Sequence, residues 1–361
     1  MIMHHCVGFE CKILIMKVAI AGASGFAGAE LIKICTRHPE LELVAVFAES
    51  SAGLTVGESH AGLSDVDLAM ISTEKLLSVV DDLDIEVVFL ALPHGASQDY
   101  VPQLLERELV IVDLGADYRL KDPGEYKSWY GVDHRQPELL ERAVYGLVEF
   151  NRDRLKGSKF IAAPGCYVTA ASLAIKPLID ESLVLSEPVI VDAASGVSGA
   201  GRTNKSQNMF MSIAENFSAY GLKNHRHTVE IETNTNAKVL FTPHLAPMTR
   251  GILATCYLRP THLIESLDAK DADELLASCY RRTFADDTFV DVEPCAPNTR
   301  STYGTNKAKV FATFDPRTNW VIAFGALDNL VKGAAGQAVQ ALNVALGFDE
   351  SLGLNEIGVW P

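Results

Sequence analysis

The sequence predicts an α/β protein with two domains, one built on a parallel sheet and one, an α+β domain, on a largely antiparallel sheet. A length of 361 residues, 48% of them hydrophobic, is enough for roughly two globular domains. In the first half, apolar runs alternate with helical segments, as in parallel sheets covered by helices; the runs are residues 17–21, 41–47, 85–92 and 109–114. The α+β domain is predicted by later strand-like runs at residues 188–194, 238–247, 251–258, 309–314 and 320–325.

Composition and charge argue against several classes of partner. No apolar run approaches the ~20 residues that a membrane-spanning helix needs. The net charge of -15 is unsuited to nucleic acid, whose phosphates attract clustered Lys and Arg. The 7 cysteines are odd in number and follow no disulfide or zinc spacing, which favours a reducing, cytoplasmic location. We therefore expect a cytoplasmic protein whose ligands are small molecules.

The first 15 residues are expected to be an extension outside the fold. They lack the basic start and the cleavage site of a signal peptide. His4, His5 and Cys6 could form a cluster of metal ligands, but short terminal tracts of this kind are often disordered or artefactual. No metal site is predicted.

A glycine-rich turn follows the first predicted strand and precedes a helical run at residues 29–35. Gly22 allows a tight turn, Gly25 allows a pyrophosphate to approach the backbone at the helix N-terminus, and Gly28 allows the helix to pack on the strand. This context predicts a Rossmann-type dinucleotide site that includes Gly22, Ala23, Ser24, Gly25 and Phe26. The alternative is a tight strand-to-helix turn without a ligand.

Polar residues follow the next strands at the edge of the sheet where ligands bind. Glu49 could hold the ribose hydroxyls of NAD, whereas Ser50 and Ser51 are compatible with the 2′-phosphate of NADP, so the cofactor stays open. Pro93 and His94 follow residues 85–92 at the same edge.

Arg119 follows residues 109–114 and would place a cation at this edge of the sheet. The alternative is a surface ion pair with Asp117 or Asp122.

Cys166 follows a Pro-Gly turn and precedes a helix of small residues. A helix N-terminus stabilises a thiolate, so the thiol could attack a carbonyl while the backbone N–H groups hold the resulting oxyanion. This position predicts alkylation of Cys166 well below pH 8. The alternative is a buried cysteine that only fills space.

Two further segments carry candidate site residues. Residues 195–202 form a loop of small residues with Arg202 at its end, which could wrap an anion, or could be a plain flexible loop.

His225 and His227 precede Thr228, which resembles a helix cap. The two imidazoles are therefore expected in a mobile, partly exposed segment, where they would titrate near neutral pH. The alternative is a solvated turn with incidental histidines. A nucleotide site, a cysteine and a histidine together suggest hydride transfer to a thioester.

Nine motifs in order resemble the N-acetyl-γ-glutamyl-phosphate reductases of the semialdehyde dehydrogenase group. The resemblance runs from Met16 to the C-terminus. It covers GASGFAGAEL (22–31), ALPHG (91–95), DLGADYRL (113–120), YGLVE (145–149), PGCY (164–167), SGVSGAGR (195–202), HRH (225–227), FTPHL (241–245) and LVKGAAGQA (330–338). Two departures, Val148 and Val229 in place of prolines, do not affect the chemistry.

The resemblance implies a reaction and a set of site residues. Cys166 would form the thioester, His225 or His227 would be the acid/base, with His225 preferred, and Arg119 and Arg202 would hold substrate anions together with Ser195. NADP would be the cofactor, and further cofactor-binding residues would be Ser50, Pro93, His94, Gly196, Gly199 and Asn329. The reaction would be the NADPH-dependent reductive dephosphorylation of N-acetyl-γ-glutamyl phosphate to the semialdehyde, in arginine biosynthesis, by a homo-oligomer (dimer or tetramer).

The domains follow from the same resemblance. We expect residues 16–162, with a C-terminal helix at about 328–361, to form the NADP-binding domain, and residues 163–327 to form the catalytic and oligomerisation domain. Two alternatives remain: an aspartate-semialdehyde dehydrogenase, which shares this architecture and thiol chemistry, and a non-enzymatic, dinucleotide-binding redox sensor.

Overall fold

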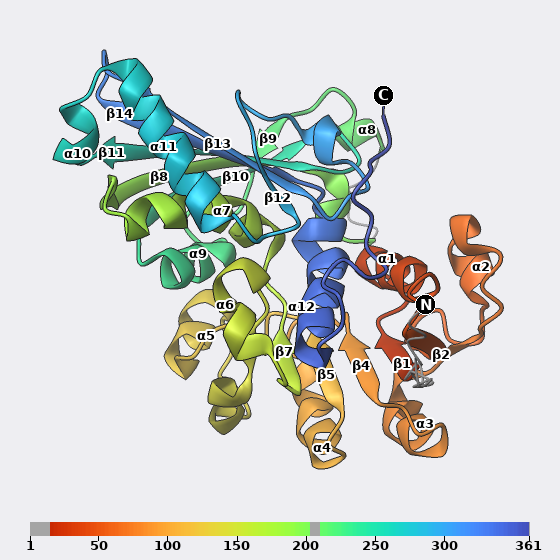
Figure 1. Ribbon diagram of the computed structural model, residues 1–361. Coiled ribbons are helices and arrows are strands. Elements are labelled where there is room, and N and C mark those ends of the chain that lie inside the picture. The colour runs from red at the N-terminus through yellow and green to blue at the C-terminus, as the bar shows by residue number, and fades with distance from the viewer. Residues whose placement is uncertain (1–14, 203–209, 361) are drawn as a thin grey trace, which may run out of the picture.

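Two seven-stranded sheets, one above the other, dominate the structure (Figure 1). The computed structural model describes residues 15–202 and 210–360. The suggested cluster of His4, His5 and Cys6 lies outside the described residues, as does most of the expected extension at residues 1–15.

The first sheet is entirely parallel, as the alternation of strands and helices predicts. Its strand order is β3-β2-β1-β4-β5-β7-β6. The strands are β1 (Met16–Ala21), β2 (Leu41–Phe47), β3 (Met70–Ile71), β4 (Val87–Leu90), β5 (Val110–Asp113), β6 (Val144–Tyr145) and β7 (Phe160–Ala162). The order reverses between β1 and β4, and a ligand site is expected outside the carboxyl ends of the strands at such a point.

Helices cover both faces of this sheet because successive strand residues point to opposite faces. Val18 and Ile20 pack against one set of helices: α1 (Phe26–Cys35), α6 (Val148–Leu155) and α12 (Gly336–Leu346). Ala19 and Ala21 face the other set: α3 (Leu76–Asp82), α4 (Val101–Glu106) and α5 (Pro123–Tyr130). The short α2 (Val56–Ser59) lies outside these layers (Figure 1).

The second sheet is largely antiparallel, as predicted, but two of its strand pairs are parallel. Its order is β12-β13-β14-β11-β8-β10-β9. The strands are β8 (Val184–Gly196), β9 (Ser218–Ala219), β10 (Val239–Ala246), β11 (Ile252–Pro260), β12 (Val290–Val292), β13 (Ala308–Asp315) and β14 (Trp320–Leu327). β10 runs parallel to β8, and β12 parallel to β13. β8 and β10 can run parallel because the chain between them crosses over through α9 (His227–Thr235).

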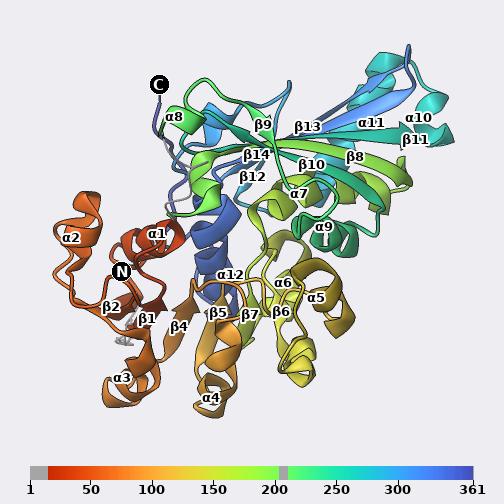
Figure 2. The ribbon, with the colours of Figure 1, turned by 180° about the vertical axis from the view of Figure 1, so that it is seen from behind.

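Helices pack on one face of the second sheet. They are α7 (Cys166–Asp180), α9 and α11 (Ala269–Thr283), whose apolar residues share a core with the strands (Figure 2). α7 crosses β14 so closely that a Cβ on Gly325 would lie 2.1 Å from the carbonyl oxygen of Ala170. The short α8 (Phe210–Ile213) and α10 (His262–Glu265) lie at opposite ends of the sheet. Among the described helices none covers the opposite face, on which Phe311 and Phe324 stack.

The chain returns from the second sheet to the first through a π-helical turn, Val331–Ala335, which leads into α12. Lys332 in this turn is completely buried, and its ammonium group pairs with the equally buried carboxylate of Glu149 in α6. Lys332 also donates to the side-chain oxygen of Gln340 at 2.6 Å, and the amide of Gln340 donates to Glu149 at 3.1 Å. Burying these charges is tolerable only because each has its partners.

Removing one partner of this ion pair should destabilise the fold strongly. We expect Lys332→Met to lower the free energy of unfolding by ~3–5 kcal/mol, because the Glu149 carboxylate would stay buried without a cation. The double variant Lys332→Met/Glu149→Met should recover much of this loss. Urea unfolding followed by circular dichroism measures both, and a single variant within ~0.5 kcal/mol of wild type would contradict the prediction.

Candidate active site

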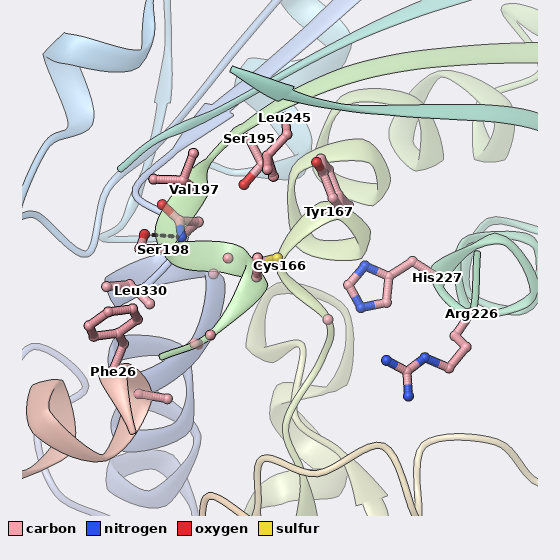
Figure 3. Close-up of a pocket in the computed structure, with 18 of the residues that line it drawn as sticks. Phe26, Cys166, Tyr167, Ser195, Val197, Ser198, Arg226, His227, Leu245 and Leu330 are labelled. Carbon is pink, nitrogen blue, oxygen red and sulfur yellow. Dashed lines mark hydrogen bonds between the residues drawn. The ribbon is translucent and has the colours of Figure 1, made fainter. Parts of the chain in front are cut away.

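A cavity of about 930 Å³ lies between the two sheets and collects most of the predicted site residues (Figure 3). It is bounded by the carboxyl ends of β4 and β5, the N-termini of α1 and α7, and the loop after β8. The predicted residues that line it are Gly25, Phe26, His94, Arg119, Cys166, Ser195, Gly199, Arg202, His225, His227 and Asn329.

The glycine turn has the geometry of a nucleotide-binding turn. Gly22 has a φ of +85°, and a Cβ on it would lie 2.1 Å from the carbonyl oxygen of Ala91. A Cβ on Gly28 would lie 2.3 Å from the oxygen of Gly22, so α1 packs directly on the turn. Residues 26–28 line the cavity, and N–H groups in the first turn of a helix have no intrahelical acceptor. This end of α1 therefore fits the pyrophosphate of a dinucleotide.

Ala23 and Ser24 shape this turn and do not line the cavity. Ala23 is completely buried, and its N–H donates to Phe47 at 2.9 Å. Ser24 contributes its carbonyl oxygen, which accepts a hydrogen bond from Arg202 at 3.0 Å. The side chains of these two residues are therefore not placed to contact a ligand in the cavity.

Four other predicted cofactor residues also lie outside the cavity lining, namely Gly22 of the same turn and Ser50, Pro93 and Gly196. Ser50 is exposed beyond the end of β2, and Pro93 lies in the turn after β4. Gly196 ends β8, where a Cβ would lie 2.6 Å from the backbone nitrogen of Arg250. Gly196 thus permits a close backbone approach.

Asn329 reaches the cavity, but its amide group holds the loop after β8. Its oxygen accepts the N–H of Gly251 at 2.7 Å, and its nitrogen donates to the hydroxyl of Ser198 at 2.9 Å. The neighbouring Ser195 hydroxyl donates to the Gly196 carbonyl at 3.0 Å. Asn329 therefore positions the small-residue loop that faces the glycine turn.

Cys166 is the first residue of α7, as the Pro-Gly turn predicts. A Cβ on the preceding Gly165 would lie 2.4 Å from Nε2 of His227, so only glycine lets the imidazole pack there. On its other side, a Cβ on Gly333 would lie 2.8 Å from the Cβ of Cys166. Figure 3 shows the sulfur of Cys166 and the ring of His227 facing one another across the cavity.

The protonation of Cys166 differs from the sequence-based expectation of a thiolate. Burial raises the pKa of the thiol to about 11, against the opposing effects of the Tyr167 N–H and the charge of Arg119. The helix N-terminus is present, but desolvation of the sulfur outweighs it. Burial therefore favours the protonated thiol of Cys166 at neutral pH, and a thiolate at this position would need a base to form it.

The two histidines are partly exposed, as expected, but Thr228 does not cap the helix. α9 begins at His227 after Arg226, without a side-chain cap, because Thr228 already lies in the first turn. Burial and then the charge of Arg226 lower the pKa of His225 to about 4. Burial also holds the pKa of His227 well below its usual value. Both imidazoles are therefore neutral at pH 7. The expectation that they titrate near neutral pH is wrong, because burial lowers the pKa of each.

The geometry favours His227 over His225 as the partner of the thiol. His227 packs on Gly165, next to Cys166. His225 lies edge-on to Tyr167 and Phe241, and its Nδ1 accepts the backbone N–H of His227 at 3.2 Å. His225 thus holds the start of α9 in place.

A buried carboxylate that the sequence analysis did not single out connects these parts. Glu230, in the first turn of α9, is 1% exposed. One of its oxygens accepts the N–H of Gly165 at 2.9 Å and the hydroxyl of Tyr145 at 2.5 Å, and the other pairs with Arg119 at 3.3 Å. The spacing between His227 and Glu230 could have identified Glu230 from the sequence, because a residue three positions after His227 lies on the same side of a helix.

The two predicted substrate arginines are held apart. Arg119 is buried and pairs with Glu230, so the alternative of a surface pair with Asp117 or Asp122 is wrong. Arg202 reaches the glycine turn, where it donates to Ser24 and also to the hydroxyl and carbonyl of Ser59 at 3.0 and 2.8 Å. Arg202 therefore lies on the nucleotide side of the cavity.

Within residues 15–202 and 210–360 there is no group of three side chains placed to hold a metal ion. In the same ranges no helix is long and apolar enough to cross a membrane.

Comparison with known proteins identifies both parts of the chain. Residues 17–158 match the family model for the NAD binding domain of semialdehyde dehydrogenases, and residues 166–329 match the model for their dimerisation domain. The chain is 44% identical over 354 residues to N-acetyl-γ-glutamyl-phosphate reductase from Desulforudis audaxviator, covering 96% of this chain and 100% of that protein. It is 40% identical to the enzyme of the same name from Cellvibrio japonicus, with the same coverage.

Solved structures of lower identity share the fold. Aspartate semialdehyde dehydrogenase II from Vibrio cholerae, solved in complex with ASA, superimposes with a TM-score of 0.67 at 17% identity, covering 91% of this chain and 98% of that one. Aspartate semialdehyde dehydrogenase from Candida albicans, solved with NADP, gives a TM-score of 0.60 at 17% identity and the same coverage. These are distant relatives, so the alternative of an aspartate-semialdehyde dehydrogenase is not supported. The chain belongs to the N-acetyl-γ-glutamyl-phosphate reductase family of the semialdehyde dehydrogenases.

Proposed function

We propose that the protein catalyses the NADPH-dependent reductive dephosphorylation of N-acetyl-γ-glutamyl phosphate to N-acetyl-L-glutamate 5-semialdehyde, in arginine biosynthesis. The observation that carries this proposal is the arrangement of Cys166 and His227 in a cavity that also receives the glycine turn of α1. The reductases to which the chain is similar bear this activity in their names. A non-enzymatic redox sensor would not need this combination of thiol, imidazole and arginines.

Cys166 and His227 would carry the covalent chemistry. Neutral His227 takes the thiol proton, and the sulfur attacks the acyl carbon. N–H groups at the start of α7 hold the oxyanion, and His227 returns its proton to the departing phosphate as the carbon–oxygen bond breaks. A reduced nicotinamide dinucleotide, held at the glycine turn of α1, would supply the hydride that the thioester needs to reach the oxidation level of an aldehyde. The carbon–sulfur bond then breaks, the aldehyde leaves, and the Cys166 thiolate takes a proton from solvent.

The residues around the cavity divide between substrate and cofactor. We assign the substrate to Arg119 and Ser195, near Cys166, and the dinucleotide to the turn of Gly22 to Phe26 and to Gly199. Arg202 would stabilise the part of the cavity that binds the cofactor, because it donates a hydrogen bond to Ser24 in the glycine turn. NADP is the proposed cofactor, and Ser50, which is exposed beyond the end of β2, would bind its 2′-phosphate.

We further propose how the chain is organised around this site. Residues 16–162, with 328–361, form the NADP-binding domain, which is supported by the packing of α12 on the first sheet. Residues 163–327 form the catalytic and oligomerisation domain. A homo-oligomer would bury the face of the second sheet that the described helices leave open, and the dimerisation name of the matching family model supports this. A cytoplasmic location is supported by the free state of all described cysteines.

The direct test is the reaction run in reverse on purified protein. N-acetylglutamate semialdehyde and phosphate, with NADP and NAD in parallel, should give phosphate-dependent formation of reduced nicotinamide. Cys166→Ser should lower turnover by at least about a thousandfold, because the hydroxyl is a far weaker nucleophile than the thiolate. Cys295→Ser, which changes an exposed cysteine, is the matched control and should keep full activity. Near-normal turnover of Cys166→Ser would contradict the mechanism, and turnover only with aspartate semialdehyde would contradict the substrate.

Variants of the two histidines should differ in kcat in the same assay. We expect His227→Asn to lower kcat by about 10²–10⁴-fold, because it removes the base that takes the thiol proton. His225→Asn should cost less than about tenfold, because asparagine can still accept the His227 N–H. Dinucleotide affinity, measured by fluorescence, serves as the control for folding. The reverse ranking of the two variants would assign the base to His225.

The labelling of Cys166 by iodoacetamide should depend steeply on pH. Since burial raises the pKa of Cys166 to about 11, only a small fraction is thiolate at pH 7, and the labelling rate should rise roughly tenfold per pH unit between pH 7 and 10. Peptide mass mapping distinguishes Cys166 from the exposed Cys295. A rate that has already reached its plateau at pH 7 would show that the helix N-terminus prevails over burial.

A further inference from the structure

Arg226 is a cavity cation that the proposed mechanism does not use. It lies between the two histidines, is half-buried, and lines the cavity with its guanidinium group 5.3 Å from the ring centre of Tyr130. Within the described residues no carboxylate lies within 4 Å of it. By contrast, Arg119 pairs with Glu230, and Arg202 is occupied by Ser24 and Ser59. Arg226 therefore retains its charge for a ligand.

Its position differs from that of Arg119 relative to the nucleophile. Arg119 is connected to the residue before Cys166 through Glu230, which accepts the N–H of Gly165. Figure 3 shows the guanidinium group of Arg226 beyond His227 as seen from Cys166. The cavity thus offers one cation near the sulfur and a second one farther along.

A second observation at the same place also indicates a ligand. The hydroxyl group of Tyr130, the residue on which Arg226 stacks, is buried and has no hydrogen-bond partner among the described residues. Buried hydroxyl groups are normally bonded, so this one is available to a polar group that enters the cavity. A guanidinium group and a hydroxyl group on one wall together suit a planar carboxylate.

We propose that Arg226, assisted by the Tyr130 hydroxyl, binds the α-carboxylate of the N-acylated substrate. This inference rests on the proposed function. The acyl phosphate must meet Cys166, so its phosphate leaves near the sulfur and Arg119. The carboxylate stands at the other end of the carbon chain and meets the more distant cation. Arg226 thereby makes the enzyme selective for an acyl phosphate that carries a carboxylate at this distance.

The test uses the reverse reaction, in which aldehyde and phosphate are varied separately. Arg226→Gln should raise the KM for N-acetylglutamate semialdehyde about 10- to 100-fold, and the KM for phosphate should change less than about twofold. Arg226→Lys keeps the charge without the fork of donors and should recover part of the loss. Tyr130→Phe should raise the same KM by less, because it removes one neutral hydrogen bond.

An aldehyde in which hydrogen replaces the carboxylate provides the decisive control. Its kcat/KM should be low with the wild-type enzyme and nearly unchanged by Arg226→Gln, because the lost partner is already missing. Three results would overturn the proposal: a rise in the KM for phosphate instead, an equal effect of Arg226→Gln on both aldehydes, or a fall in kcat alone. Wild-type turnover is measured in the same series, so a failure of the proposed function appears separately, as no turnover at all.

Discussion

The arrangement of the site depends on one buried carboxylate, that of Glu230. It accepts the N–H of Gly165, the residue before Cys166, and the hydroxyl of Tyr145 at the end of β6, and it pairs with the guanidinium of Arg119 after β5. A carboxylate without water must satisfy its oxygens within the protein, so these groups are held at fixed positions around it. Since Glu230 lies in the same helix turn as His227, α9 is fixed against α7, and the imidazole is fixed against the thiol.

Burial also determines which protonation states the site favours. Desolvation of Cys166 and His227 favours the neutral form of each, so the resting pair consists of a thiol and an imidazole without net charge. Three arginines, Arg119, Arg202 and Arg226, line the cavity of an otherwise acidic chain, and they differ in their partners: Arg119 pairs with Glu230, Arg202 bonds to Ser24 and Ser59, and Arg226 stacks on Tyr130.

The two sheets are held together by the C-terminal part of the chain. In the segment after β14, Gly333 packs closely against Cys166, and Lys332 is buried in an ion pair with Glu149. The helix that follows, α12, packs on the first sheet. The nucleotide-binding half and Cys166 are therefore in direct contact with the same short segment. Asn329, just before it, fixes the loop that faces the glycine turn.

The sequence alone determined the features that depend on local chemistry. The glycine turn, the Pro-Gly start of α7 and the alternation of apolar runs require particular residue types at neighbouring positions, so the parallel sheet and the position of Cys166 could be predicted. Tertiary structure decided what depends on contacts between distant segments. Which histidine packs on Gly165, which arginine pairs with Glu230, and whether the thiol is ionised follow from burial and from contacts between segments that are far apart in the sequence. A sequence shows which side chains can carry a charge, but how far each of them is removed from water depends on tertiary packing.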